Sequence, residues 1–457
     1  MKRIISKIKA VVLLKKNDYT TDEERNNERI RRMSWTSLAA LFAQLLQMAI
    51  PLITVRVTLR YMGEEVYANW TTINSLFSLM TYADMGLGNG LQTTLSQETG
   101  KEQFDGRRIV SSTYFVVITI SLALMSIFLI VFPMVDWNKI VGVEKTELRA
   151  LTAPILLAIL IPKIISIPLT LVRRTENAMQ EGYFAYIFQG IASILSLVSI
   201  YITVLLNLGS VMVIFISSSI PVIVSVANSC FYYFKNPKVR PGFRFIDIKI
   251  AKNMFFVGIT FFILSILNSV SLNLDNYIVS KAASLNDVTP FSLALRATQL
   301  INVACTVLSA PLWAANGEAK SRGDYKWISR MTSKLSIISV IIVIIATVIL
   351  MLVGPFLFNL WVGYDIGISK FLLLGMLLQQ IAFAFISPYF MVLNAFGKIK
   401  IQIFWFAIFT PIALIAKYLS CLYLGIQWLS YFGTLAYTLF IIIPIFIYTK
   451  KIIKISD

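Results

Sequence analysis

Apolar stretches alternate with short polar connections along almost the whole chain. A helix needs about 20 consecutive apolar residues to cross a bilayer, and twelve stretches of this chain meet that requirement. They lie at 34–55, 66–88, 111–133, 151–171, 184–205, 210–234, 253–279, 289–315, 335–359, 371–394, 401–423 and 427–448. The pattern predicts an all-α polytopic membrane protein with twelve transmembrane helices.

The basic residues fall mainly in alternate connections. With the amino terminus placed in the cytoplasm, 31 of the 41 Lys and Arg residues lie in cytoplasmic segments, 7 lie in outer loops and 3 lie within spans. Cytoplasmic loops retain Lys and Arg because basic flanks resist translocation. The asymmetry therefore predicts that both termini are cytoplasmic and that the number of spans is even.

Polar segments divide the predicted spans into two groups of six. The basic start of the chain predicts an amphipathic helix on the inner leaflet, and residues 18–32 predict a charged, solvated connector. A shift of about 221 residues aligns the layout of the two groups, as expected of a parallel repeat, and the linker between them is interpreted as a hinge. The predicted segments are an N-terminal cytoplasmic segment (1–33), a six-helix bundle (34–234), a basic cytoplasmic linker (235–252), a second six-helix bundle (253–448) and a basic cytoplasmic tail (449–457).

Composition agrees with a membrane protein. The chain is 57% hydrophobic and 14% charged, with a mean hydropathy of +0.75, far from the composition of a soluble domain. A formal charge of +18 would suggest a nucleic-acid partner for a soluble chain. Here most of the basic residues face anionic lipid headgroups, so the expected partner is the bilayer and not nucleic acid.

The residue types used for metal and proton chemistry are scarce. Cys230, Cys305 and Cys421 all fall within predicted spans and show no paired spacing, and the chain has no histidine. We therefore expect no metal site and no disulfide. Any coupling to protons would have to use carboxylates, because histidine is the side chain that titrates nearest neutral pH.

No motif for catalysis or nucleotide hydrolysis is present. Gly100-Lys101 is followed by Glu102, which excludes the phosphate-binding loop of many ATPases. The glycine-rich run Gly86–Gly90 follows an apolar helix, so it predicts close helix packing and not a dinucleotide site. No nucleophile and base occur at a suitable spacing, so we expect neither an enzyme nor a bound cofactor.

Ionisable residues inside the spans are the remaining candidates for function, because charge is expensive in hydrocarbon. Three are basic (Lys163, Arg296 and Lys417) and two are acidic (Asp84 and Asp275). The positive balance favours an anionic passenger, and an arginine can hold a phosphate in a two-pronged geometry. We expect Lys163, Arg296 and Lys417 to bind substrate in a cationic cavity, and Asp84 and Asp275 to serve ion coupling or gating.

Structural roles remain open for several of these residues. Asp275 and Arg296 could neutralise each other between adjacent helices, while Lys417 could extend to the outer interface. Asp84 could cap a helix end, since it stands beside Gly86. Lys163 is the strongest single candidate for a cavity role because its depth makes extension to the interface difficult.

Four segments carry a resemblance to a known family. Arg60–Trp70 followed by Ala83–Leu91 resembles the start of the bacterial O-antigen and polysaccharide flippases. The segment Ser309–Ala315, with Ser321–Asp324 after it, is similar to span 8 and the following loop of that family. These flippases form one branch of the multidrug, oligosaccharidyl-lipid and polysaccharide exporter superfamily, and the twelve-span layout extends the resemblance over the whole chain.

The resemblance implies a flippase of the bacterial inner membrane. Such a protein moves an undecaprenyl-diphosphate-linked oligosaccharide, for example an O-antigen repeat of lipopolysaccharide, from the inner to the outer leaflet by alternating access. It implies that Lys163 and Arg296 line a central cationic cavity. Transport could be coupled to the membrane potential or to a Na⁺ or H⁺ gradient, and other membrane proteins of polysaccharide assembly are possible partners.

Two alternatives come from other functional classes. A multidrug or cation antiporter of the same superfamily would be expected to place carboxylates in its cavity, whereas the basic residues within these spans outnumber the acidic ones. A non-transporting scaffold for glycan-assembly enzymes offers no reason for charges inside the membrane.

Overall fold

The computed structural model describes the protein as helices joined by short connections. It describes residues 22–63, 66–67, 69–70, 73–74, 77, 80, 82–99, 104–141, 146–283, 285–362 and 368–456. No β-strand occurs in these residues. The all-α polytopic fold expected from the hydrophobic pattern is therefore confirmed.

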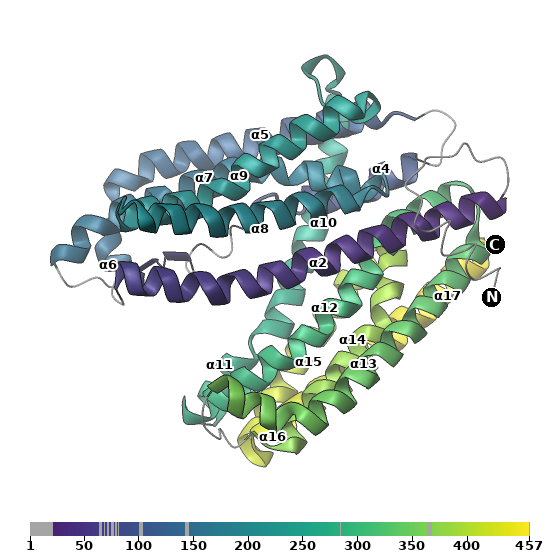
Figure 1. Ribbon diagram of the computed structural model, residues 1–457. Helices are drawn as coiled ribbons and strands as arrows, with labels where there is room; N and C mark the ends of the chain where they lie inside the picture. Colours follow the sequence, from purple (N-terminus) through teal and green to yellow (C-terminus); the bar gives the residue numbers. More distant parts are fainter. Residues whose placement is uncertain are drawn as a thin grey trace, which may run out of the picture. The chain divides into compact units, whose positions relative to one another are not determined.

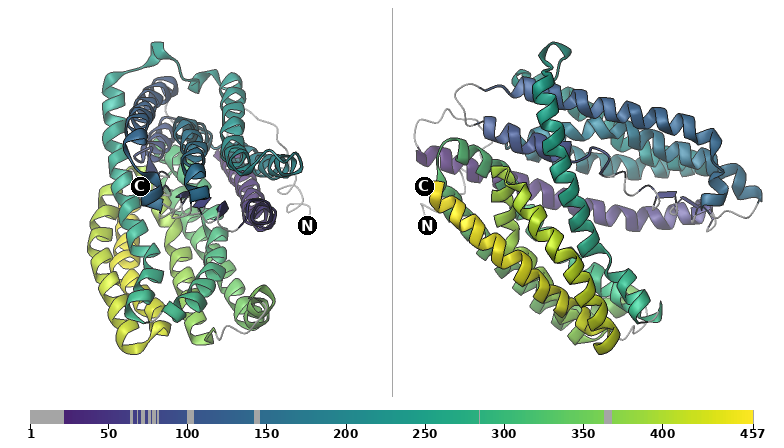
Figure 2. Two further views of the ribbon diagram at one scale, coloured as in Figure 1. Left: turned by 90° about the vertical axis from the view of Figure 1, so that its left-hand side faces the viewer. Right: turned by 180° about the vertical axis from the view of Figure 1, so that it is seen from behind.

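The described residues form two compact units (Figures 1 and 2). The first unit takes those of Met1–Leu95 and Gln103–Ile259, and the second takes those of Ser96–Glu102 and Thr260–Asp457. The boundary between the bundles thus falls inside a helix, α10, and the predicted linker belongs to the first unit. The helices up to that boundary are α2 (Asp22–Met62), α4 (Leu87–Glu98), α5 (Gly106–Val131), α6 (Trp137–Val141), α7 (Thr146–Ala178), α8 (Gly182–Leu205), α9 (Ser210–Lys235) and α10 (Ile248–Asn273).

The second unit continues with helices of similar length. Its final predicted span is not one regular α-helix, because a short π-helical segment, η5 (Thr438–Ile442), interrupts it. The helices are α11 (Asp275–Ala282), α12 (Leu285–Ser321), α13 (Tyr325–Val362), α14 (Lys370–Phe396), α15 (Ile399–Leu424), α16 (Ile426–Tyr437) and α17 (Ile443–Ser456).

Each unit is built around one enclosed helix. In the first unit, 56% of the apolar span of α7 is buried, whereas only 11% of the span of α5 is. In the second unit the enclosed helix is α14, with 61% of its span buried. Figure 1 shows α5, α7, α8 and α9 running side by side, and α7 contributes to two apolar clusters of that unit. Residues on α7 are therefore the ones best placed to form an internal site.

The outward faces of the helices are apolar, as lipid requires. On α5, for example, Leu122, Leu129 and Ile130 are more than half exposed. Exposed apolar surface of this extent marks contact with a membrane or a partner in general. Eleven helices among the described residues are long and apolar enough to span a bilayer. The other predicted span, 66–88, is described only in part, since residues 68, 71–72, 75–76, 78–79 and 81 lie outside the described residues.

The segment before the first span differs from the prediction. Residues 1–21, which include the whole of the predicted amphipathic helix, lie outside the described residues. From Asp22 onward the chain is already helical and runs into the first span as part of α2. Arg29 and Arg31 are buried, and Glu28 accepts hydrogen bonds from Arg31 and Arg32. The prediction of a solvated connector was therefore wrong for its described part, because these charges are paired along one helix face.

The linker after α9 is anchored on the start of α5. The hydroxyl groups of Ser111 and Ser112 accept hydrogen bonds from the backbone N–H groups of Gly242 (3.1 Å) and Asp247 (2.9 Å). The guanidinium of Arg107 lies 3.8 Å from the centre of the Phe245 ring. These contacts hold the linker within the first unit.

The glycine-rich run Gly86–Gly90 permits close packing, as expected. A Cβ atom on Gly90 would lie 3.1 Å from a methyl group of Val257 on α10. Facing it on α10, a Cβ on Gly258 would lie 3.0 Å from the backbone oxygen of Met85 and 2.9 Å from Leu87. Because backbone and a fully buried leucine cannot move aside easily, α4 and α10 approach each other only through glycines.

We predict that Gly258→Ala lowers the free energy of unfolding by about 1–3 kcal/mol, the usual cost of overpacking. Gly190→Ala is the matched control in the same unit, because its added Cβ would meet its nearest neighbour, Leu46, at an ordinary 3.5 Å. Thermal unfolding of the detergent-purified variants measures both effects. Equal unfolding temperatures for the two variants would contradict the packing argument.

Candidate functional site

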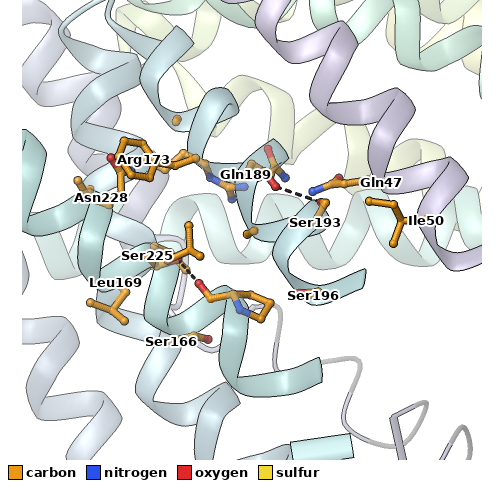
Figure 3. A pocket seen from close by; sticks show the side chains of 17 residues that line it. Gln47, Ile50, Ser166, Leu169, Arg173, Gln189, Ser193, Ser196, Ser225 and Asn228 are labelled. Carbon is orange, nitrogen blue, oxygen red and sulfur yellow. Dashed lines mark hydrogen bonds between the residues drawn. The ribbon is translucent and has the colours of Figure 1, made fainter. Parts of the chain in front are cut away.

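A cavity of about 540 Å³ lies inside the first unit (Figure 3). Its size falls within the range of roughly 300–1,000 Å³ that small-molecule sites occupy. Four helices line it: α2 contributes Gln47 and Ile50; α7 contributes Ser166, Leu169, Thr170, Val172 and Arg173; α8 contributes Ala185, Phe188, Gln189, Ala192, Ser193 and Ser196; α9 contributes Pro221, Val224, Ser225 and Asn228.

The polar side chains of the cavity come from stripes at helical spacing. Ser166, Thr170 and Arg173 follow one another by four and three residues on α7. The same spacing places Gln189, Ser193 and Ser196 on one face of α8, and Ser225 and Asn228 on one face of α9. Residues three and four apart lie above one another on a helix. Three helices therefore direct a polar face at the same space.

Several polar atoms of the cavity remain available to a ligand. Gln189 Oε1, Ser196 Oγ and Asn228 Oδ1 are buried and have no hydrogen-bond partner among the described residues. Buried polar groups are usually paired, so atoms of this kind mark a place where water or a ligand can bind. The other hydroxyl groups donate to carbonyl oxygens of their own helices and keep acceptor capacity: Ser166 to Lys163 (2.6 Å), Thr170 to Ile167 (2.8 Å), Ser193 to Gln189 (3.0 Å) and Ser225 to Pro221 (2.8 Å).

Arg173 is the charged side chain among the described residues that line the cavity. Figure 3 shows Gln47 and Gln189 extending toward each other from α2 and α8, with Arg173 nearby. A guanidinium can bind a phosphate through two parallel hydrogen bonds. The amides can pair with hydroxyl groups, and the ring of Phe188 offers an apolar face. The lining thus suits an anionic, hydroxyl-rich molecule.

Lys163 extends the polar stripe of α7 beyond the cavity lining, since it stands three residues before Ser166. Its ammonium group donates a hydrogen bond to the Asn74 side-chain oxygen (3.2 Å). The side chain is partly exposed. A role in substrate binding stays a prediction for Lys163.

Asp84 caps the start of α4. Its two carboxylate oxygens accept hydrogen bonds from the backbone N–H groups of Gly86 (3.1 Å) and Gly88 (3.2 Å). A carboxylate is stabilised at this position by the free N–H groups and the dipole of a helix N-terminus. This is the capping role left open from the sequence, and ion coupling by Asp84 stays a prediction.

Asp275 forms an ion pair with Lys417 and not with Arg296. The Lys417 ammonium lies 2.6 Å from Asp275 Oδ1 and also donates to the Ser271 backbone oxygen at 3.2 Å. Lys417 is 0% exposed, so the idea that it extends to the membrane interface was wrong. Gly433 makes the pair possible, because a Cβ there would lie 2.6 Å from Lys417 Cε. Binding of substrate by Lys417 and gating by Asp275 stay predictions.

Arg296 on α12 is exposed. It forms no ion pair or hydrogen bond with the residues that the structure describes. The structure therefore leaves its guanidinium available, and its assignment to substrate binding stays a prediction.

The cavity itself was missed at the sequence level. Arg173 lies two residues beyond the end of the fourth predicted span (151–171), so it was not among the charged residues within the spans. In the structure α7 continues to Ala178. The polar stripes on α7, α8 and α9 were visible as three-and-four spacing and would have indicated the site. The grouping of these helices around one space was not visible.

The first part of the chain matches the model of a known protein family. Residues 34–311 match the family described as "Polysaccharide biosynthesis protein". The chain belongs to this family. It is a multi-pass membrane protein, and the family is not one of enzymes.

Similar proteins agree with this assignment. A protein of Yersinia pseudotuberculosis with the curated name "Putative O-antigen export protein" is 24% identical over 370 residues, which cover 78% of this chain and 82% of that protein. A structure of MATE in complex with MaD3S has a TM-score of 0.80 at 17% identity and covers 94% of this chain and 97% of that one. A MOP superfamily transporter from Pyrococcus furiosus, described as having a binding pocket of reverse polarity, has a TM-score of 0.79 at 15% identity, with 94% of this chain and 96% of that one covered. These solved structures show the fold.

The Lys417–Asp275 pair gives a prediction about stability. Lys417→Met leaves a buried carboxylate without a counter-charge, so we expect the free energy of unfolding to fall by about 3–5 kcal/mol. Replacing both partners, as Lys417→Met with Asp275→Leu, should recover most of that loss. Thermal unfolding of purified protein compares the variants. A single variant as stable as the unmodified protein would contradict the pairing.

Proposed function

We propose that this chain is a flippase that moves an undecaprenyl-diphosphate-linked oligosaccharide from the inner to the outer leaflet of the bacterial inner membrane by alternating access. The observation that carries the proposal is the cavity of the first unit, whose wall holds Arg173 and several uncharged polar side chains, in a chain of the polysaccharide biosynthesis family. The name of the Yersinia relative, which refers to O-antigen export, supports the same class of cargo.

The chemistry of the cavity fits the headgroup of such a lipid. Arg173 supplies a guanidinium for the diphosphate, and the buried acceptors of Gln189, Ser196 and Asn228 can receive hydrogen bonds from sugar hydroxyl groups. Hydroxyl and amide groups also tolerate different sugars, since they can both donate and accept. Lys163 and Arg296 are proposed as further cationic contacts for the cargo, each on its own unit.

The membrane potential can contribute to the driving force. An outward movement of negative charge from a negative cytoplasm gains roughly 2.3 kcal/mol per charge per 100 mV. A diphosphate carries about two such charges at neutral pH. We therefore propose that transport needs no bound cofactor, and that Na⁺ or H⁺ exchange, if present, adds to this force.

A multidrug or cation antiporter is the competing function within the same fold. A site for cations would be expected to place carboxylates in its wall, because an opposite charge offsets the desolvation of the ligand. Among the described residues of the cavity wall the charged group is Arg173, which repels a cation. The observation favours the flippase.

The test is a strain that lacks this gene, complemented with the unmodified protein, Arg173→Ala, Arg173→Lys or Arg108→Ala. We expect Arg173→Ala to lower the transport rate by about tenfold to a hundredfold, since a hydrogen bond to a charged group contributes about 1.5–3 kcal/mol. Arg173→Lys should retain part of the rate. The readouts are lipid-linked glycan in the cells and polysaccharide at the surface.

Arg108→Ala is the control, because that side chain is exposed on α5 and makes only a long contact with Asp105 (3.8 Å). Each variant is compared at equal amounts in the membrane. Normal surface polysaccharide in the deletion strain, together with raised sensitivity to cationic drugs, would favour the antiporter instead. If Arg173→Ala restored surface polysaccharide as completely as Arg108→Ala, Arg173 would not be part of the binding site.

A further inference from the structure

A buried carboxyl group lies directly behind the wall of the cavity. Glu176 stands one helical turn after Arg173 on α7, and it is 0% exposed. No Lys or Arg among the described residues lies within ion-pair distance of it. An ionised carboxylate in such a place bears a large desolvation cost, and no ion pair offsets it.

Only one of the two carboxyl oxygens of Glu176 has a hydrogen-bond partner among the described residues. Its Oε2 accepts a hydrogen bond from the Asn228 side-chain amide nitrogen at 3.2 Å. The other oxygen of each group, Glu176 Oε1 and Asn228 Oδ1, is buried without a hydrogen-bond partner among the described residues. Two planar groups are thus joined by one hydrogen bond, and each holds an acceptor that lacks a donor.

One added proton would remove both the uncompensated charge of Glu176 and the missing hydrogen bond between the two side chains. A protonated carboxyl group carries one O–H donor beside an acceptor oxygen. When Glu176 is protonated, its O–H can donate to Asn228 Oδ1 while Asn228 continues to donate to Oε2. The result is a closed pair with two hydrogen bonds and no net charge. We propose that Glu176 and Asn228 form a proton-binding site in the wall of the cavity.

The surroundings of Glu176 hold few charges. The hydroxyl group of Tyr232 donates to the carboxylate of Glu181 at 3.0 Å, and a chain of hydroxyl groups joins Thr175, Tyr233 and Tyr114 at 3.2 and 3.1 Å. The charged and titratable groups that act on Glu176 or belong to this network are Arg173 on α7, Glu181 before α8, Tyr232 and Tyr233 on α9 and Tyr114 on α5. Arg173 is the attractive charge among them.

The proton site has a consequence for the cargo, and this step rests on the proposed function. An ionised Glu176 would attract Arg173 and repel a diphosphate bound beside it. A protonated Glu176 leaves Arg173 free to hold the diphosphate. The proton and the anion therefore favour each other's binding, and such a coupling is reciprocal. Glu176 is a positioning residue that sets the pH range in which the cavity accepts an anionic headgroup.

Infrared spectroscopy of the purified full-length protein tests the proton site without any cargo. The unmodified protein should show the C=O stretch of a buried protonated carboxyl group at neutral pH, and Glu176→Gln should lose it. Glu176→Gln with Asn228→Asp places the acid on α9 and should restore the band. Asp105→Asn, which changes an exposed carboxylate on the surface, should leave the band unchanged. A band that persists in Glu176→Gln would overturn the proposal.

Binding of inorganic diphosphate, measured from neutral to alkaline pH, tests the coupling. In the unmodified protein the affinity should fall by up to about tenfold per pH unit once the proton is lost, since one proton is bound together with the anion. The Glu176→Gln side chain keeps two hydrogen bonds to Asn228 and carries no charge at any pH. The affinity of this variant for diphosphate should therefore change with pH only through the protonation of the diphosphate.

The two experiments separate the proposals. Loss of the infrared band in Glu176→Gln, without diphosphate binding at any pH, would keep the proton site and overturn both the coupling and the proposed cargo. Diphosphate binding with the same pH dependence in the unmodified protein and in Glu176→Gln would keep the cargo and overturn the coupling. A pH-dependent loss of affinity that Glu176→Gln removes would support both.

Discussion

The structure depends on the need to satisfy polar groups inside a bilayer. Lipid provides no hydrogen bonds, so the backbone must be helical and polar side chains must find partners within the protein. The two units meet this need by surrounding α7 and α14 with other helices. Polar residues on these enclosed helices then face protein or an internal cavity. The same constraint explains why the charged groups described within the helices are mostly capped, paired or directed at enclosed space.

Buried charge is handled in two ways in this chain. In the second unit, Asp275 and Lys417 compensate each other completely, and a buried pair of this kind fixes the arrangement of the helices that carry it. In the first unit, Arg173 faces the cavity and Glu176 lies behind its wall without a counter-charge. A buried charged or polar group without a partner raises the free energy of the folded protein. Such groups are therefore more informative about function than the satisfied pair. The cavity of the first unit is the best candidate for the binding site for that reason.

The glycine positions connect the fold to the site. Gly433 leaves room for Lys417, and Gly90 and Gly258 allow α4 and α10 to approach closely. Packed interiors tolerate little change in volume, so these contacts hold the helices of each unit in one arrangement.

The sequence alone determined the class of the protein and the course of most helices, because hydrophobic length and the distribution of Lys and Arg are local properties of the chain. For Asp84 it predicted ion coupling or gating and left open the helix cap that the structure shows, because Gly86 stands beside it. Tertiary structure decided which groups meet. The pairing of Asp275 with Lys417 joins residues 142 positions apart, and the bond between Glu176 and Asn228 spans 52. Periodicity fixes the face that a residue occupies on its own helix, but only the packing of the helices decides which face lies opposite it.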